Sequence, residues 1–221
     1  MYGKFLVEGD KSVRELIESS FEIDFIYAIQ DWSGSKESAI EVISETELLQ
    51  ISTHEKPNQV IAVAVIPIQQ ELPKLEEKLY LVCDSLSDPG NAGAIIRIAD
   101  WFGIHTLFFS ENSVDVYNPK VVSSAKGSLL RTNIYYVDLK KLFQENKQLN
   151  VFGTFMNGEN IYEASLPESG FILLGNEANG ISDELNPFLT KKLSIPAYGK
   201  AESLNAAVAA GIVVSEFKRR K

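Results

Sequence analysis

The chain has 221 residues, of which 45% are hydrophobic and 23% are charged, and its formal net charge is −9. This composition is typical of a globular protein, and no apolar run is long enough to span a bilayer, so we exclude an integral membrane protein. One cysteine and two histidines exclude a disulfide framework and leave too few ligands for a zinc site, and no signal-peptide region follows the first residues. We therefore expect a cytoplasmic protein that uses no metal.

The charge is unevenly distributed along the chain. Residues 1–78 hold 7 Lys and Arg against 15 Asp and Glu (−8), whereas residues 79–221 hold 14 against 15 (−1). Proteins that bind nucleic acids usually present a basic surface, so the charge of the first third argues against a nucleic-acid partner for this region. A local basic patch from Lys4, Lys11 and Arg14 is still compatible with this balance.

The first third of the sequence predicts a small α/β domain over residues 1–70. Residues 5–9 are expected to be extended, residues 12–18 have helical spacing, and residues 25–28 and 60–66 read as strands. The following segment is polar and contains a proline, so we predict a linker at 71–78 and a second domain at 79–221.

From residue 79 onward, strand patterns alternate with helical ones, which predicts a mostly parallel sheet with helices on both faces. The strands are expected at 79–83, 106–109, 134–137, 151–155, 171–174 and 193–195. The helices are expected at 92–102, 119–130, 139–146, 183–191 and 204–219. Asn118, Asp138, Ser182 and Ser203 are predicted helix caps.

Three polar loops follow strands, at the edge where open α/β sheets bind ligands. Residues 84–93 contain glycines that would let the backbone approach a ligand, and they lead into a helix that carries Arg97. A plain turn capped by Asn91, with a solvated Arg97, fits the spacing equally well. In residues 174–182, Glu177 could act as an acid, a base or a hydrogen-bond acceptor, or simply face water.

The third loop, residues 195–205, leads into an apolar helix rich in small residues. Capping alone accounts for Ser203, whereas Asn205 lacks so simple an explanation. The small side chains at 206–211 allow close helix approach, so this helix is predicted to be buried or to form a subunit contact.

Together and in this order, the three loops resemble the motifs of the SpoU (TrmH-like) family of RNA ribose methyltransferases. The resemblance covers residues 79–221, and residues 1–70 are more loosely similar to a small ribosomal-protein-like RNA-binding domain, chiefly over residues 5–11. The matching motif residues are Asn91, Gly93, Arg97 and Phe102-Gly103; Gly175-Asn176-Glu177 and Gly180; and Ile195-Pro196 with Ser203-Leu204-Asn205.

The resemblance implies an α/β trefoil-knot (SPOUT) domain preceded by a small substrate-binding domain, a homodimer formed through the knotted domain, S-adenosylmethionine as cofactor, and rRNA or tRNA as partner. It assigns cofactor binding to Gly175, Asn176, Ile195, Leu204 and Thr154. It assigns catalysis and its support to Arg97, Asn91, Glu177, Ser203 and Asn205.

The implied reaction is in-line attack of a ribose 2′-oxygen on the sulfonium methyl group. The family assigns activation of the hydroxyl to Arg97, but a guanidinium stays protonated in proteins, so stabilising a developing alkoxide is easier to defend than proton removal. Glu177 or an RNA phosphate are the alternative proton acceptors.

Two rival functions are compatible with parts of the sequence. A Rossmann-like nucleotide-binding enzyme would explain residues 89–93 after a strand, although the Gly-x-Gly-x-x-Gly spacing fails. A noncatalytic RNA-binding protein on the same fold is the second. Cys83 is expected to be a buried structural thiol, and Arg131 to contact RNA phosphate or to be solvated.

Overall fold

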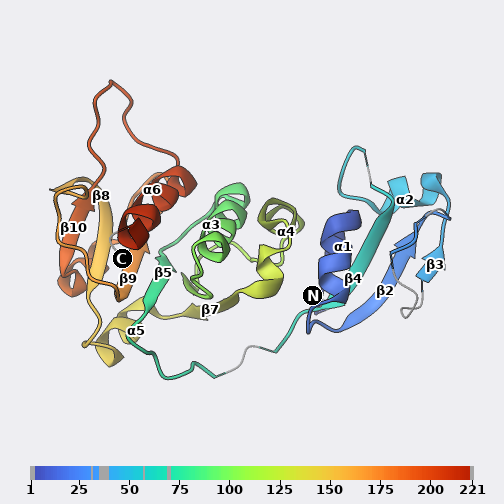
Figure 1. The fold of residues 1–221 in the computed structure, drawn as a ribbon, viewed down its shortest axis with the longest axis horizontal. Coiled ribbons are helices and arrows are strands. Elements are labelled where there is room, and N and C mark those ends of the chain that lie inside the picture. The colour runs from blue at the N-terminus through green and yellow to red at the C-terminus, as the bar shows by residue number, and fades with distance from the viewer. Residues whose placement is uncertain (1–2, 31, 35–39, 57, 69–70, 220–221) are drawn as a thin grey trace.

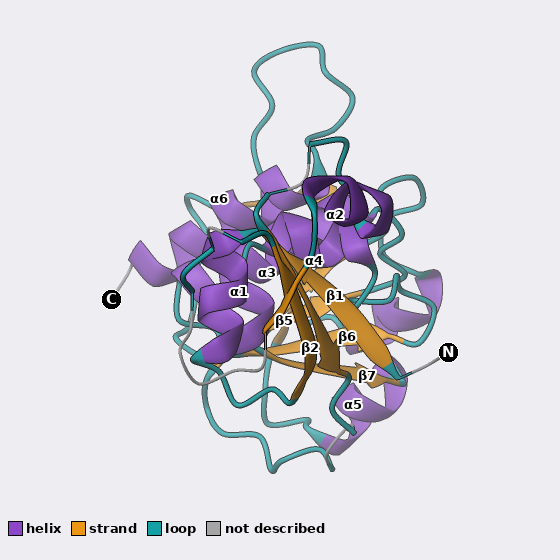
Figure 2. Ribbon diagram, turned by 90° about the vertical axis from the view of Figure 1, so that its right-hand side faces the viewer, coloured by secondary structure: helices purple, strands orange, loops and turns teal. Residues whose placement is uncertain are grey.

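The computed structural model describes residues 3–30, 32–34, 40–56, 58–68 and 71–219, which form two β-sheets with surrounding helices (Figures 1 and 2). The N-terminal sheet has the strand order β1-β4-β2-β3, in which only the β2–β3 pair is parallel. Its elements are β1 (Lys4–Glu8), α1 (Asp10–Ile17), β2 (Ile23–Ala28), β3 (Ile40–Val42), α2 (Glu45–Ile51) and β4 (Val60–Val65). The predicted α/β character and three of these strands are confirmed.

Two elements of this region escaped prediction, β3 and α2. The helix α2 carries a recognisable start signal, because Ser44 accepts a hydrogen bond from the Glu47 backbone while the Glu47 carboxylate accepts one from the Ser44 backbone. This reciprocal capping box stabilises the first turn of a seven-residue helix that buries only Leu48.

The second sheet contains six strands in the order β10-β8-β9-β5-β6-β7, and every neighbouring pair is parallel. Its elements are β5 (Leu79–Cys83), α3 (Pro89–Trp101), β6 (Thr106–Ser110), α4 (Pro119–Ala125), η1 (Ser128–Arg131), β7 (Asn133–Val137), α5 (Leu139–Glu145), β8 (Val151–Asn160), β9 (Gly170–Leu174), η2 (Asp183–Phe188), β10 (Lys191–Ser194) and α6 (Ala206–Arg219). The predicted parallel α/β sheet is thus confirmed.

Helices cover both faces of this sheet. All five residues of β5 are buried: Leu79, Leu81 and Cys83 pack with α3, α4 and α6, while Tyr80 and Val82 pack with α5 and η2. A strand buried on both faces is an unbroken apolar run, which is why its sequence is easily recognised.

Several predicted boundaries are wrong for local reasons. The helix expected at 119–130 breaks after α4, because Lys126 and Gly127 adopt left-handed backbone angles, and a short 3₁₀ helix follows. The helix expected at 183–191 is a 3₁₀ helix that ends at Phe188 with Pro187 inside it.

Two of the four predicted caps are confirmed, Asn118 and Asp138, whose side chains accept hydrogen bonds from the first turns of α4 and α5. The predicted cap at Ser182 is wrong, because its side chain makes no such bond. The predicted cap at Ser203 is also wrong, because α6 begins only at Ala206.

The N-terminal sheet contacts the second region of the chain where β1 packs against α4. The rings of Phe5 and Tyr117 lie 4.8 Å apart, and one apolar cluster contains residues of both regions. Residues 71–78 contain neither helix nor strand, so the division into two domains with a linker stays a prediction. In the described part of the chain, no helix combines the length and hydrophobicity needed to cross a bilayer.

The topology brings the three polar loops together. After β5 the chain adds β6 and then β7 on one side of β5 within the sheet. It then crosses over, and β8, β9 and β10 lie on the opposite side of β5. Because all six strands are parallel, the loops after β5, β9 and β10 leave from the same edge, and β5 and β9 are neighbours at the point where the winding reverses.

Candidate functional site

Glu177 links the loop after β9 to the loop after β5. Its carboxylate accepts hydrogen bonds from Asn91 Nδ2 at 2.9 Å, from Ser87 Oγ at 3.2 Å, and from the backbone N–H groups of Ser87 and Asp88 at 3.5 and 3.4 Å. A carboxylate with this many donors is held firmly in one position. Two of the predicted site residues, Asn91 and Glu177, are therefore in direct contact although 86 positions separate them.

Asn205 connects the third loop to this pair. Its Nδ2 donates to Asn91 Oδ1 at 2.7 Å, while its Oδ1 accepts from the backbone N–H groups of Ala207 and Val208 at 2.9 and 3.3 Å. Asn205, rather than Ser203, thus caps α6 and fixes that helix to α3. The result is a continuous chain of hydrogen bonds, Asn205–Asn91–Glu177, across all three predicted motifs.

The sequence left open that Asn91 caps α3, but the structure shows a different capping residue. Asp88, and not Asn91, accepts the capping hydrogen bond, from the Asn91 backbone at 2.7 Å. The side chain of Asn91 is therefore available for Glu177 and Asn205, and it is buried.

Asp84 was missed by the sequence reasoning. It is buried at the end of β5, and its carboxylate accepts hydrogen bonds from the Ser182 backbone at 2.7 Å and from Ser85 Oγ at 3.1 Å. Asn176 adds a second connection by donating to the Ser85 carbonyl at 2.7 Å. The sequence did carry a signal, because an acidic residue follows directly after a wholly apolar strand. A carboxylate buried at such a position is tolerated only if hydrogen bonds stabilise its charge.

Two glycines of the motifs serve close packing of the chain. A Cβ atom at Gly175 would lie 2.2 Å from the carbonyl carbon of Gly180, so only glycine fits where the loop folds back on itself. A Cβ atom at Gly93 would lie 2.5 Å from Ser124 Cβ in α4. Gly93 thus lets α3 and α4 approach closely, and the expectation that the glycines of the first loop admit a ligand stays a prediction.

The electrostatics of Glu177 favour its charged form. Partial burial raises the pKa of its carboxyl, but hydrogen bonds from the Asn91 side chain and from backbone N–H groups outweigh burial, so the pKa lies below its ordinary value. A carboxylate of lowered pKa is a weak base, which favours positioning over proton removal.

Arg97 lies in the third turn of α3 and is exposed. It does not join the Asn205–Asn91–Glu177 chain, and within the described residues it has neither a hydrogen-bond nor an ion-pair partner. It lies four residues after Gly93, on the stripe of α3 that turns toward α4. Its proximity to the three loops and its role in the site stay a prediction.

The residues expected to bind a cofactor differ in how they are held. Gly175 and Asn176 belong to the hydrogen-bonded loops, and Thr154 Oγ1 donates to the Leu173 carbonyl at 3.1 Å. Ile195 packs partly against the apolar cluster, whereas Leu204 is 49% exposed. Ser203 is exposed as well, in a segment that projects between β10 and α6 (Figures 1 and 2).

Cys83 and Arg131 both have structural surroundings. Cys83 is fully buried, and burial raises the pKa of its thiol, as expected for a structural residue. Arg131 bonds the Asp100 carboxylate at 2.8 and 3.0 Å and Glu15 at 2.8 Å while its side chain stays 47% exposed, so its predicted contact with RNA phosphate stays a prediction. No group of three His, Cys, Asp or Glu side chains among the described residues is arranged to hold a metal ion.

An open, parallel α/β sheet with three hydrogen-bonded loops at one edge defines a class of proteins that bind a ligand at that edge. The chain belongs to the SpoU rRNA Methylase family, whose profile matches residues 78–215. The predicted family is thereby confirmed, and neither the Rossmann-like nor the noncatalytic rival is favoured.

Individual relatives agree with this assignment. The chain is 32% identical, over 97% of its length and 88% of the relative, to the 23S rRNA (guanosine(2553)-2′-O)-methyltransferase RlmP of Bacillus subtilis. It is similar to a Porphyromonas gingivalis structure described as a TrmH-family RNA methyltransferase, with a TM-score of 0.86, 35% identity, and coverage of 99% and 91% of the two chains. The SpoU methyltransferase AviRb of Streptomyces viridochromogenes, solved with AdoMet, has a TM-score of 0.86 at 27% identity, with 99% and 90% covered.

Proposed function

We propose that this protein transfers a methyl group from S-adenosylmethionine (AdoMet) to a ribose 2′-hydroxyl of ribosomal or transfer RNA. The observation that carries the proposal is the Asn205–Asn91–Glu177 chain, which joins the three family motifs in one site. The names of the relatives, which act on the 2′-oxygen of 23S rRNA, support the substrate class.

The loops offer groups that suit AdoMet. Gly175 provides backbone without a side chain, while Ile195 and the half-exposed Leu204 provide apolar surface for an adenine ring. Asn176 follows β9, and Thr154 lies within the neighbouring strand β8, where its hydroxyl donates to the Leu173 carbonyl near the end of β9, so both would line the same region. When bound, the cofactor supplies an electrophilic methyl group on a sulfonium.

The roles of the polar residues follow from their contacts. Arg97, which has no partner in the described structure, stabilises the negative charge that develops on the ribose oxygen. Asn91 and Asn205 hold α3 and α6 in register, and Glu177 holds the loops after β5 and β9. Because the carboxylate of Glu177 is already occupied and its pKa is lowered, an RNA phosphate is the better proton acceptor. Ser203, which is exposed in the segment before α6, would contact substrate or cofactor.

The same proposal includes a trefoil knot in which the chain after the second motif threads a loop, a homodimer of a cytoplasmic protein, and an N-terminal region that recruits the substrate. Exposed apolar side chains support the dimer: Trp101 on α3 is 86% exposed and Val208 on α6 is 52% exposed. Large exposed apolar side chains on neighbouring helices are typical of an interface. Light scattering coupled to size-exclusion chromatography measures the oligomeric state, and a monomer would contradict this part.

Methyl transfer to RNA tests the function directly. Purified protein with methyl-labelled AdoMet and RNA from a strain lacking the gene should label the RNA, and ribose methylation mapping should locate the label on a 2′-oxygen. Arg97→Lys keeps the charge but loses the planar fork, so we expect a rate loss of at least about 100-fold with AdoMet affinity unchanged. Calorimetry should detect AdoMet and no NAD; NAD binding or unlabelled RNA would contradict the proposal.

A further inference from the structure

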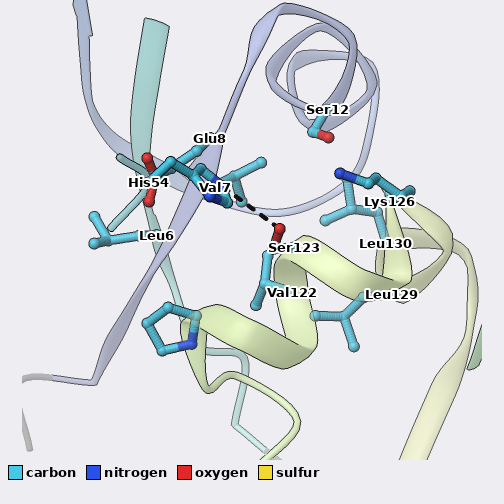
Figure 3. Close-up of a pocket in the computed structure, with 12 residues that line it drawn as sticks. Leu6, Val7, Glu8, Ser12, His54, Val122, Ser123, Lys126, Leu129 and Leu130 are labelled. Carbon is cyan, nitrogen blue, oxygen red and sulfur yellow. Dashed lines mark hydrogen bonds between the residues drawn. The ribbon is translucent and has the colours of Figure 1, made fainter. Parts of the chain in front are cut away.

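An open hollow of about 330 Å³ lies between the N-terminal sheet and α4. Three separate segments line it: the end of β1 with the start of α1, the loop before β4, and the residue that follows α4. Its lining residues are Glu8, Gly9, Asp10, Lys11, Ser12, His54, Lys56, Asn58 and Lys126. A smaller, more apolar pocket continues beneath it, and Figure 3 shows Ser12 on one side of that pocket and Lys126 and Ser123 on the other.

The positive charges of the hollow are available, whereas its negative charges are engaged. Within the described residues, Lys56 and Lys126 form no ion pair, and Lys11 has only a 3.9 Å contact with Glu15. Glu8 accepts hydrogen bonds from Ser52 Oγ at 2.6 Å and from the backbone and hydroxyl of Thr53, and Asp10 binds Arg14 at 2.8 Å and Trp32 Nε1 at 2.6 Å. Three lysines from distant parts of the sequence therefore line one open hollow with two carboxylates that are hydrogen-bonded to other groups.

Lys126 occupies a position that its side chain disfavours. Its φ of 52° lies in the left-handed region, which costs a residue with a Cβ atom about 1–2 kcal/mol and which glycine adopts freely. The next residue is Gly127, with a φ of 86°, so the chain uses glycine there but not at 126. Lys126 is the residue at which α4 ends, and its backbone N–H donates to the Val122 carbonyl, so this helix end fixes the start of its side chain beside the hollow.

The helix α4 connects the hollow to the candidate site. In its first turn, Lys120 lies 4.0 Å from the carboxylate of Asp88, whose backbone N–H donates to Glu177. Lys126 follows six residues later, about 9 Å along the helix axis. The two lysines thus mark the two ends of one short helix, one beside the motif loops and one beside the hollow.

We infer that the hollow binds a backbone phosphate of the RNA substrate, so that the RNA strand runs along α4 from the methylation site into the space between the two sheets. This inference rests on the proposed function. It also bears on the acidic balance of the first third: although this region is acidic overall, Lys11 and Lys56 line the same hollow as Lys126.

Variants in which uncharged residues replace the lysines test this phosphate contact. The triple variant Lys11→Ala, Lys56→Ala, Lys126→Gly is compared with Lys147→Ala, which lies just after α5 on the other face of the sheet. The probe is fluorescein-labelled, fragmented ribosomal RNA, titrated at several KCl concentrations. Each lost phosphate contact should reduce the slope of log K against log salt by about 0.7–0.9, so for the one phosphate of the hollow we expect a fall of that size and an affinity loss of at least about 10-fold at low salt.

The variant Lys126→Gly separates this role from a structural one. Removing the left-handed lysine should leave thermal stability unchanged or raised, while RNA affinity falls and the Kd for AdoMet stays the same. Inorganic phosphate, added at an ionic strength matched with KCl, distinguishes the source: an RNA site loses no more affinity in phosphate than in KCl, whereas stronger displacement of RNA by phosphate than by KCl would assign the hollow to free phosphate and overturn the inference.

The results also distinguish the two proposals. Wild-type protein that methylates RNA, together with a triple variant of unchanged affinity and salt slope, would overturn the phosphate site and leave the function standing. Loss of salt-dependent binding in the triple variant, in a protein that transfers no methyl group, would support the phosphate site and contradict the proposed function.

Discussion

The loops after β5 and β9 differ sharply from the third part of the site, the segment 195–205. The first two are joined by hydrogen bonds through Asp84, Asn176 and Glu177. The third exposes 94% of Tyr198 and 49% of Leu204, and Asn205 at its end joins it to the others. One half of the site is therefore preorganised by the chain itself, while the other half leaves apolar surface for whatever binds there.

The largest effect is expected where the preorganised half is most tightly packed. Gly175→Ala places a Cβ atom against the Gly180 backbone, which cannot yield as a side chain can. We expect a loss of about 1–3 kcal/mol in the free energy of unfolding, measured in urea, together with loss of AdoMet binding. Gly199→Ala, in the exposed segment with nothing within 4 Å, is the matched control and should change stability by less than about 0.5 kcal/mol. Equal effects of the two variants would refute the contrast.

Asn91→Ala removes the centre of the hydrogen-bond chain. It leaves the Glu177 carboxylate and the Asn205 amide without their shared partner, so we expect destabilisation by about 1–3 kcal/mol and a lower methyl-transfer rate. In a double-mutant cycle with Asn205→Ala, the double variant should lose less free energy of unfolding than the sum of the losses in the two single variants. Strict additivity would mean that the two residues act independently.

Leu204→Ser tests the exposed half. Because the side chain is 49% exposed in the free protein, stability should change by less than about 0.5 kcal/mol. If AdoMet covers Leu204, its Kd should rise by about 10-fold, as expected from losing a buried leucine contact. Ile68→Ser, 93% exposed and remote from the motifs, controls for a general effect and should leave the Kd unchanged. An unaltered Kd in both variants would remove Leu204 from the cofactor site.

The smallest effect is a change in pH dependence. The folded pKa of Glu177 lies below its ordinary value of 4.5, so its stabilisation is present above that pH and is lost as the pH falls through the folded pKa. Glu177→Gln should therefore flatten the decline of the unfolding free energy below about pH 4.5, measured by urea titrations from neutral to acidic pH. Glu202→Gln, in the exposed segment, should keep the wild-type slope. A steeper acid limb in Glu177→Gln would mean that folding raises the pKa of Glu177 instead of lowering it.

Sequence reasoning found the second sheet well because β5 and its neighbours are apolar runs, and because Asn118 and Asp138 begin helices by side-chain capping. It failed where tertiary contacts decide. Arg131 binds Glu15, 116 residues away, and Gly93 is fixed by Ser124 of another helix, and no local pattern encodes either contact. For the site, the motifs predicted Asn91, Glu177 and Asn205 but not Asp84, whose role is visible only once Ser182 lies beside it.

A crystal structure of the protein with bound AdoMet tests the central claim most directly. Our account predicts the cofactor at the edge formed by the three loops, in contact with Gly175, Ile195 and Leu204, with its methyl group facing the side of α3 that carries Arg97. A cofactor bound elsewhere, or Arg97 directed away from the methyl group in every subunit, would contradict it.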